Sequence, residues 1–168
     1  RRMVLKRFLL LCKEERSSVD KIYLDDILFQ HWIWDGQFKG DEFDQLSRDA
    51  VCYESPHHLM RIKDSIHYKA LATNDFTTYN RFCETTRRET ETHRHTEKRY
   101  RELIDNFDTS RLLEDKITLN WHERTNKYVV SNGRHRLSIL SISKNSHGLK
   151  LVAIPRDYFI ICEGYLPR

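Results

Sequence analysis

The sequence contains few residues that break regular secondary structure and no apolar run long enough to cross a membrane. Only five of its 168 residues are glycine and three are proline, so the chain has few obvious breaks. Near its start, the run Phe8 to Cys12 contains five apolar residues. A signal-peptide core needs about 7–15 such residues, and a membrane span needs about 20. We therefore expect a cytoplasmic protein without a transmembrane segment.

Cysteine is also sparse, and its spacing excludes the common zinc motifs. The four cysteines are far apart and none belongs to a Cys-x-x-Cys pair, and the nine histidines include no His-x-x-x-His pair on a predicted helix. We expect reduced thiols in an intracellular protein and no metal held by protein side chains alone. The spacing by itself leaves one or two disulfides open.

No excess of one charge sign dominates the chain. Lys and Arg number 29 against 25 Asp and Glu, a formal net charge of +4 with neutral histidine. Dedicated nucleic-acid binders concentrate their basic residues on one face, whereas acids and bases are interleaved along most of this chain. The charge pattern therefore argues against nucleic acid as a partner.

The remaining pattern predicts one α+β domain with a small mixed sheet flanked by helices. Segments with apolar residues at helical spacing predict helices over residues 3–15, 75–92, 96–107 and 134–142. Alternating or short apolar runs predict strands over residues 50–53, 117–121, 128–130 and 149–154. A helix is also expected after Ser17 or Ser18, and a flexible stretch over 35–41. We therefore expect residues 1–48 to form a helical N-terminal extension of a core over 49–168.

The strongest functional signal is a strand–glycine–helix junction, Asn132-Gly133-Arg134-His135-Arg136. Gly133 allows a ligand to approach the backbone closely, and the helix that follows presents free N–H groups and a partial positive charge. Basic residues in the first turn oppose the helix dipole unless an anion lies between them. The junction therefore predicts a phosphate site. The alternative interpretation is a solvated basic helix start.

The region from Ile117 to Ile154 resembles the motif region of ParB/sulfiredoxin-fold proteins, in which a strand, Asp-Gly-x-His-Arg and a helix follow one another. A weaker resemblance extends to Ser65–Leu71, which looks like a segment of ParB-like proteins from polysaccharide gene sets. The resemblance implies a nucleotide whose phosphates rest on the loop of Asn132, Gly133, Arg134, His135 and Arg136. Gly133, His135 and Arg136 are the phosphate contacts that it implies. That nucleotide is CTP in the ParB branch, and ATP with Mg²⁺ in the sulfiredoxin and free-serine-kinase branches.

Two departures from the family pattern bear on the expected chemistry. Asn132 replaces the usual acidic residue before the glycine, which puts catalysis by this chain in doubt. Arg134 stands where sulfiredoxins have their cysteine, which argues against sulfinic-acid reduction.

Other residues complete the expected site. Kinase members of the family place a glutamate early in the fold, so Glu54 is the expected catalytic base, with Asp64 and Glu123 as alternatives. His57 and His58 are candidates for binding the acceptor, but adjacent residues of a strand point to opposite faces, so at most one should enter a given site. The preferred interpretation is that both are plain surface residues. The polar stretch 87–95 is interpreted as a solvated helix face or a connection, or as a lid over the ligand.

Three functional hypotheses follow. The first is an ATP- and Mg²⁺-dependent transfer of phosphate to a hydroxyl of a small molecule, such as a sugar or a surface-polysaccharide precursor. The second is a CTP-binding, ParB-like module that interacts with DNA or another protein without kinase activity. The third is a family member that binds no nucleotide. The acceptor and the oligomeric state are open at this point.

Overall fold

The computed structural model describes residues 20–54, 57–86, 95–144 and 152–164. The predicted helix over 3–15, the stretch 87–94 and residues 149–151 of a predicted strand lie outside these ranges. Within the described part of the chain, no helix is long and apolar enough to cross a membrane.

The strands form one large mixed sheet and one small ribbon. In the six-stranded sheet, β2 pairs in parallel with β6 and β5 pairs in parallel with β8, and the other neighbours are antiparallel. Its strand order is β3 (Ala50–Glu54), β4 (His57–Arg61), β2 (Ile27–Trp32), β6 (Lys127–Asn132), β5 (Ile117–His122) and β8 (Phe159–Cys162). The antiparallel ribbon pairs β1 (Lys21–Tyr23) with β7 (Ala153–Pro155).

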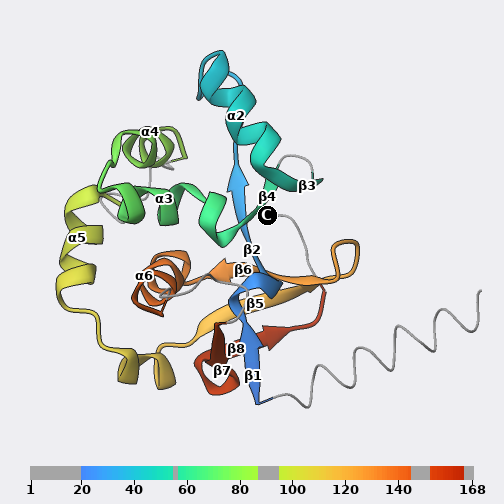
Figure 1. The fold of residues 1–168 in the computed structure, drawn as a ribbon, viewed down its shortest axis with the longest axis vertical. Helices are drawn as coiled ribbons and strands as arrows, with labels where there is room; N and C mark the ends of the chain where they lie inside the picture. The colour runs from blue at the N-terminus through green and yellow to red at the C-terminus, as the bar shows by residue number, and fades with distance from the viewer. Residues whose placement is uncertain (1–19, 55–56, 87–94, 145–151, 165–168) are drawn as a thin grey trace, which may run out of the picture.

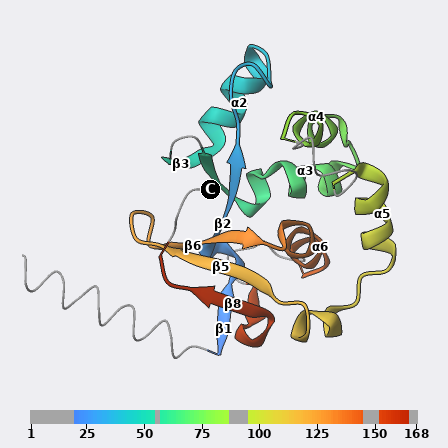
Figure 2. The ribbon, with the colours of Figure 1, turned by 180° about the vertical axis from the view of Figure 1, so that it is seen from behind.

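Four of the five described α-helices lie together on one side of the strands. Figures 1 and 2 show this group beside β2 and β6, whereas α2 lies at the far end of β2. The helices are α2 (Asp41–Asp49), α3 (Ile66–Thr73), α4 (Thr77–Thr86), α5 (Glu97–Asp105) and α6 (Arg134–Lys144). Short 3₁₀ turns cover Leu24–Asp26, Ile62–Asp64, Thr109–Leu113 and Arg156–Tyr158. The predicted α+β class is confirmed.

Local signals explain where several elements begin. Ser65 caps α3 by accepting a hydrogen bond from the Tyr68 N–H, and Thr96 caps α5 in the same way through the Arg99 N–H. The predicted helix over 96–107 is thus confirmed as α5, and the helix predicted from 75 is α4 in its described part. The strand–hairpin–strand–helix order of the last third is confirmed by β5, β6 and α6.

The expected helical extension over residues 1–48 is wrong in its described part. Residues 21–32 form β1, a 3₁₀ turn and β2, and β2 lies in the interior of the sheet between β4 and β6. Leu28 and Phe29 are both fully buried although they point to opposite faces, which is typical of an interior strand. The boundary placed at residue 49 therefore cuts through the sheet. The stretch expected to be flexible contains the buried Gln37 and Phe38.

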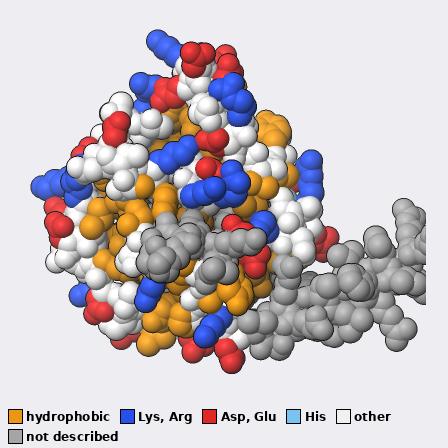
Figure 3. Space-filling model, in the orientation of Figure 1, with side chains coloured by type: hydrophobic (Ala, Val, Ile, Leu, Met, Phe, Trp, Pro, Cys, Tyr) orange, Lys and Arg blue, Asp and Glu red, His pale blue; other side chains and the backbone are white. Residues whose placement is uncertain are grey.

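The two faces of the sheet are packed differently. The helix-covered face carries two large apolar clusters, one around Phe29, Val130 and Leu140 and one around Met60, Tyr79 and Tyr100. The opposite face carries a small cluster of Leu28, Leu59 and Val129, with Cys52 packed against it. The surface in Figure 3 shows basic and acidic side chains intermixed, as the sequence predicts.

Candidate functional site

The predicted strand–glycine–helix junction is present. β6 ends at Asn132, and α6 begins at Arg134. Gly133 between them has φ of 92°, a conformation that residues with side chains rarely adopt. A Cβ atom at this position would lie 3.0 Å from Ile117 Cγ1 and 3.2 Å from Arg136 Nη2. Both the backbone angle and the close neighbours therefore require glycine at position 133.

The basic residues of the junction differ from one another in their surroundings. Arg134 is mostly buried, and its Nη1 donates a hydrogen bond of 2.7 Å to the carbonyl oxygen of Gln30 on β2. Burial lowers the pKa of Arg134, yet a guanidinium stays charged at neutral pH. Among the described residues, no carboxylate forms an ion pair with it. A largely enclosed cation thus lies at the N-terminus of α6 with a neutral hydrogen-bond partner.

Arg136, in contrast, already has an anionic partner. Its Nη1 lies 2.6 Å from Asp115 Oδ2 and also donates to the Asp115 carbonyl oxygen. The Asp115 side chain is 74 % exposed, so this pair faces water. A phosphate would have to compete with Asp115 for Arg136, whereas Arg134 has no carboxylate partner in the described part of the chain.

His135 is a neutral residue in an aromatic environment. Its Nε2 is hydrogen-bonded to the Tyr79 hydroxyl at 2.7 Å, and its ring packs edge-on against Tyr100 and His67 at centroid distances of 4.5 and 4.6 Å. Burial, with His95 and the two neighbouring arginines, lowers the pKa of His135 to about 3. The first turn of α6 therefore carries two cations, Arg134 and Arg136, and not the three basic residues expected from the sequence, because His135 is uncharged at neutral pH.

A row of four imidazoles runs from this junction toward β2. His95 stacks on His135 at 5.2 Å, His135 packs against His67, and His67 stacks on His31 at 5.3 Å. Burial holds the pKa of His31 and His67 well below the ordinary histidine value, so both are neutral. No set of three metal-binding side chains occurs in the described ranges. Sequence reasoning missed this row because its members come from separate segments with no fixed spacing.

Glu54 lies near neither the junction nor its arginines. Its Oε1 accepts hydrogen bonds from His122 Nε2 and Arg124 Nη1, each at 3.2 Å. Burial would raise the pKa of Glu54, but the hydrogen bonds from Arg124 and His122 outweigh it and lower the pKa. These partners belong to the hairpin before β6, whereas Gly133 follows β6, a separation of about 20 Å along the strand at about 3.3 Å per residue. The structure does not bring the expected base to the expected phosphate loop.

The alternative bases do not replace Glu54. Asp64 forms an ion pair of 2.6 Å with Arg61 at the end of β4, and Glu123 lies exposed in the β5–β6 turn. Both are therefore tied to parts of the fold other than the start of α6.

His57 and His58 are buried, so the interpretation that both are plain surface residues is wrong. They retain 3 % and 7 % exposure and point to opposite faces of β4, as adjacent strand residues must. The His57 ring packs against Trp32. The His58 ring packs against Tyr53 and Phe43, and its Nε2 lies 3.3 Å from Ser47 Oγ. At most His58, which lines a cavity beside β3, is placed to contact a ligand.

Comparison of the chain with protein-family models, curated proteins and solved structures found no match. The resemblance to ParB/sulfiredoxin proteins therefore stays a prediction based on residues 117–154. The structure shows that Gly133 has a positive φ at the start of α6, and that Arg134 is largely enclosed beside the Gln30 carbonyl with no carboxylate partner among the described residues.

Proposed function

We propose that this chain binds the phosphates of a nucleotide at the junction of β6 and α6. The observation that carries the proposal is Arg134, a mostly buried guanidinium with a carbonyl partner and, in the described chain, no carboxylate. Burying a charge without an opposite charge costs several kcal/mol. An anion bound at the N-terminus of α6 would offset this cost and would also accept hydrogen bonds from the free N–H groups of the first turn.

The backbone supports the same ligand. Gly133 turns the chain from β6 into α6 at a φ of 92°, and the neighbouring Ser131 and Asn132 are exposed. A phosphate would therefore match the charge of Arg134 and could reach the exposed end of β6. The ParB/sulfiredoxin resemblance implies a nucleotide at this loop, with ATP and Mg²⁺ as our first choice and CTP as the alternative.

The residues present fit a magnesium ion only in part. Asn132 offers an amide oxygen where the family has a carboxylate, and Asp115 is a carboxylate that Arg136 holds near the junction. Magnesium usually keeps several water ligands and is bound largely through the nucleotide phosphates, so these two residues would at most add to the ligands that phosphate and water supply. When bound, the ion would neutralise charge on the phosphates.

Phosphoryl transfer to a hydroxyl of a small molecule, such as a sugar, is the activity that we propose for the bound nucleotide. Glu54 does not support this step, because it lies at the other end of β6. Our proposal for the reaction therefore rests on the family resemblance, and our proposal for nucleotide binding rests on Arg134 and Gly133. The two parts can be tested separately.

The test is thermal unfolding of the full chain with ATP and with CTP, each with and without Mg²⁺. A ligand that binds only the folded state at a hundredfold excess over its Kd stabilises it by about 2.7 kcal/mol. We expect this shift in the wild type and in Arg48→Met, an arginine of α2 that serves as a control. In Arg134→Met the shift should disappear, while the ligand-free protein is as stable as the wild type or more so, because an unpaired buried charge has been removed.

Each result discriminates between the alternatives. A shift with ATP and Mg²⁺ alone favours the kinase, and assays of phosphate transfer to hydroxyl compounds then follow. A shift specific for CTP favours the ParB-like module. No shift with any nucleotide, or an equal shift in Arg134→Met, contradicts nucleotide binding at this junction.

A further inference from the structure

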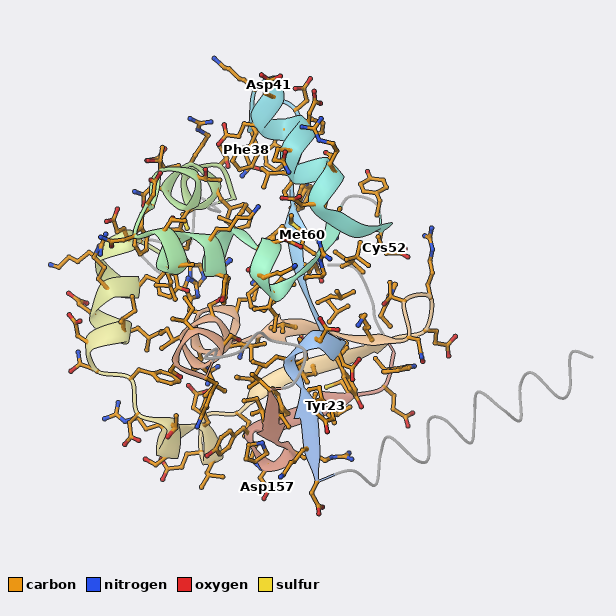
Figure 4. The ribbon with its side chains drawn as sticks, viewed as in Figure 1. Tyr23, Phe38, Asp41, Cys52, Met60 and Asp157 are labelled. Carbon is orange, nitrogen blue, oxygen red and sulfur yellow. The ribbon has the colours of Figure 1, made fainter. Side chains whose placement is uncertain are left out.

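A second cluster of reactive side chains lies beside the edge strand β3, away from the junction. A cavity of about 550 Å³ is lined there by Ser47, Cys52, Tyr53, His58, Arg124 and Thr125. Figure 4 shows Cys52 on β3, on the side where the β5–β6 hairpin approaches. The cavity therefore lies between two elements far apart in the sequence, and the hairpin contributes a hydroxyl and a guanidinium to its lining.

Starting from Thr125 at the cavity lining, three side chains form a hydrogen-bonded series. Thr125 Oγ1 lies 2.7 Å from His122 Nδ1, and His122 Nε2 lies 3.2 Å from Glu54 Oε1. The Thr125 backbone N–H also donates to His122 Nδ1, at 3.3 Å. Nδ1 must therefore be an acceptor, which places the proton of the neutral ring on Nε2, where it is donated to Glu54. In this tautomer the Thr125 hydroxyl can also donate its proton to Nδ1, at the shorter distance of 2.7 Å.

The geometry points to a nucleophilic site in which Thr125 attacks the carbonyl carbon of a small ester bound in the cavity. A hydroxyl, an imidazole acceptor and a carboxylate that orients the imidazole are the parts that such chemistry needs. Thr125 lines the cavity, so it would touch the substrate, while the side chain of His122 is only 6 % exposed and is shielded from water. Glu54 is a positioning residue that acts through His122.

The step balances without any further reagent. Thr125 Oγ forms a bond to the carbonyl carbon as its proton moves to His122 Nδ1, and the bond to the leaving alcohol oxygen breaks as that oxygen takes the proton. A water molecule then gives its proton to His122 and its hydroxide to the acyl carbon, and Thr125 leaves and regains the proton. Arg124 also lines the cavity, and its Nη1 donates to Glu54 Oε1, so it helps to hold the carboxylate that positions His122.

The hydrogen bond between His122 and Glu54 is more than a purely structural role of the hairpin would need. A His–Thr hydrogen bond across the turn could hold residues 122–125 by itself. Glu54 comes from β3, 68 positions away along the chain, and bonds the other ring nitrogen. Its carboxylate accepts the Nε2 proton and links the hairpin to β3, a contact that the turn alone does not require.

The test uses the full chain and 4-nitrophenyl acetate, with nitrophenol release followed by absorbance and acid-quenched protein mapped by mass spectrometry. We expect an acetyl group on Thr125 and an initial burst of at most one equivalent. Thr125→Val and His122→Gln should lower the rate of the burst by about 100-fold or more, as loss of a positioned base does. Thr125→Ser should restore the adduct, and Thr73→Ala, an exposed threonine of α3, should behave as the wild type.

Two further measurements separate the proposal from its rivals. Glu54→Gln should lower the rate of acylation of Thr125 and leave the KM for 4-nitrophenyl acetate unchanged, since Glu54 acts through His122; a loss of the folded hairpin would change both. Cys52→Ser should keep the Thr125 adduct. Acetylation of Cys52 or of surface lysines in place of Thr125, or a Thr125 adduct that persists in His122→Gln, would overturn the proposal. None of these outcomes bears on nucleotide binding at α6.

Discussion

The replacement of Gly133 by alanine tests the geometry of the junction most directly. At φ of 92° an alanine costs about 1–2 kcal/mol in backbone energy. Its Cβ would also lie 3.0 Å from Ile117 Cγ1, a buried side chain of β5 that has little room to move. Overpacking of this kind costs about 1–3 kcal/mol. We therefore expect Gly133→Ala to lower the free energy of unfolding by about 2–5 kcal/mol.

Gly164 provides the matched control. It has φ of 79°, and a Cβ there would meet no atom within 4 Å, so Gly164→Ala should cost only the backbone term of about 1–2 kcal/mol. The loss of unfolded-state entropy from Gly→Ala is common to both variants and cancels in the comparison. Equilibrium urea unfolding measures both free energies. Equal losses in the two variants would refute the close contact between residue 133 and Ile117.

Two other predictions concern stability alone. The pKa of His135 is about 3 in the folded state and about 6.5 in the unfolded state, so the unfolded state binds more protons between these pH values. The free energy of unfolding should therefore fall as the pH drops below about 6.5, by up to about 1.4 kcal/mol per pH unit for this residue. His31 and His67, whose pKa values are also lowered, act in the same direction. Urea unfolding at pH 7.5 and 5.5 measures this change. His135→Gln should reduce the dependence of the free energy of unfolding on pH. A stability that does not depend on pH would contradict three enclosed neutral imidazoles. Thr96→Ala removes the side chain that caps α5 by accepting a hydrogen bond from the Arg99 N–H at 3.3 Å, and it should lower the free energy of unfolding by about 1 kcal/mol. Thr109→Ala is the control, because the cap of its 3₁₀ turn is made by the neighbouring Asp108. It should cost less in the same assay.

Sequence patterns predict the last third of the chain well because its signals are local. Ile117, Leu119 and Trp121 alternate with polar residues, and they lie on one face of β5. Gly133 ends the returning strand, and the helix begins at the next residue. Each of these features depends on residues within a few positions of one another, so spacing is enough to find them.

The error over residues 20–32 has a different cause. Ile22, Leu24, Ile27 and Leu28 satisfy a helical stripe and a short apolar strand almost equally. Pairing with β4 and β6, which come from distant parts of the chain, decides in favour of the strand. Tertiary pairing of this kind overrides local preference and is absent from a single sequence.

The candidate site was predictable in its backbone and less so in its side chains. The junction was found through Gly133, but the sequence alone cannot show that Arg136 is paired with Asp115 while Arg134 is enclosed next to Gln30. Likewise, the expectation that Glu54 is the catalytic base rests on the kinase members of the family, which place a glutamate early in the fold. Its partners proved to be His122 and Arg124, because β3 lies at the edge of the sheet where the hairpin reaches it.

The environment of Arg134 also explains why neutral histidines suit this junction. His31 and His67 lie near Arg134, and the positive charge of that arginine contributes to lowering the pKa of both. Were either imidazole protonated, two cations would share one buried region without a carboxylate from the described chain. Neutral imidazoles instead fill the space between β2, α3 and α6 and leave Arg134 as the cation that an incoming phosphate would meet. An anion at Arg134 should therefore raise the pKa of His67 and His135, which links ligand binding to the protonation of the whole imidazole row.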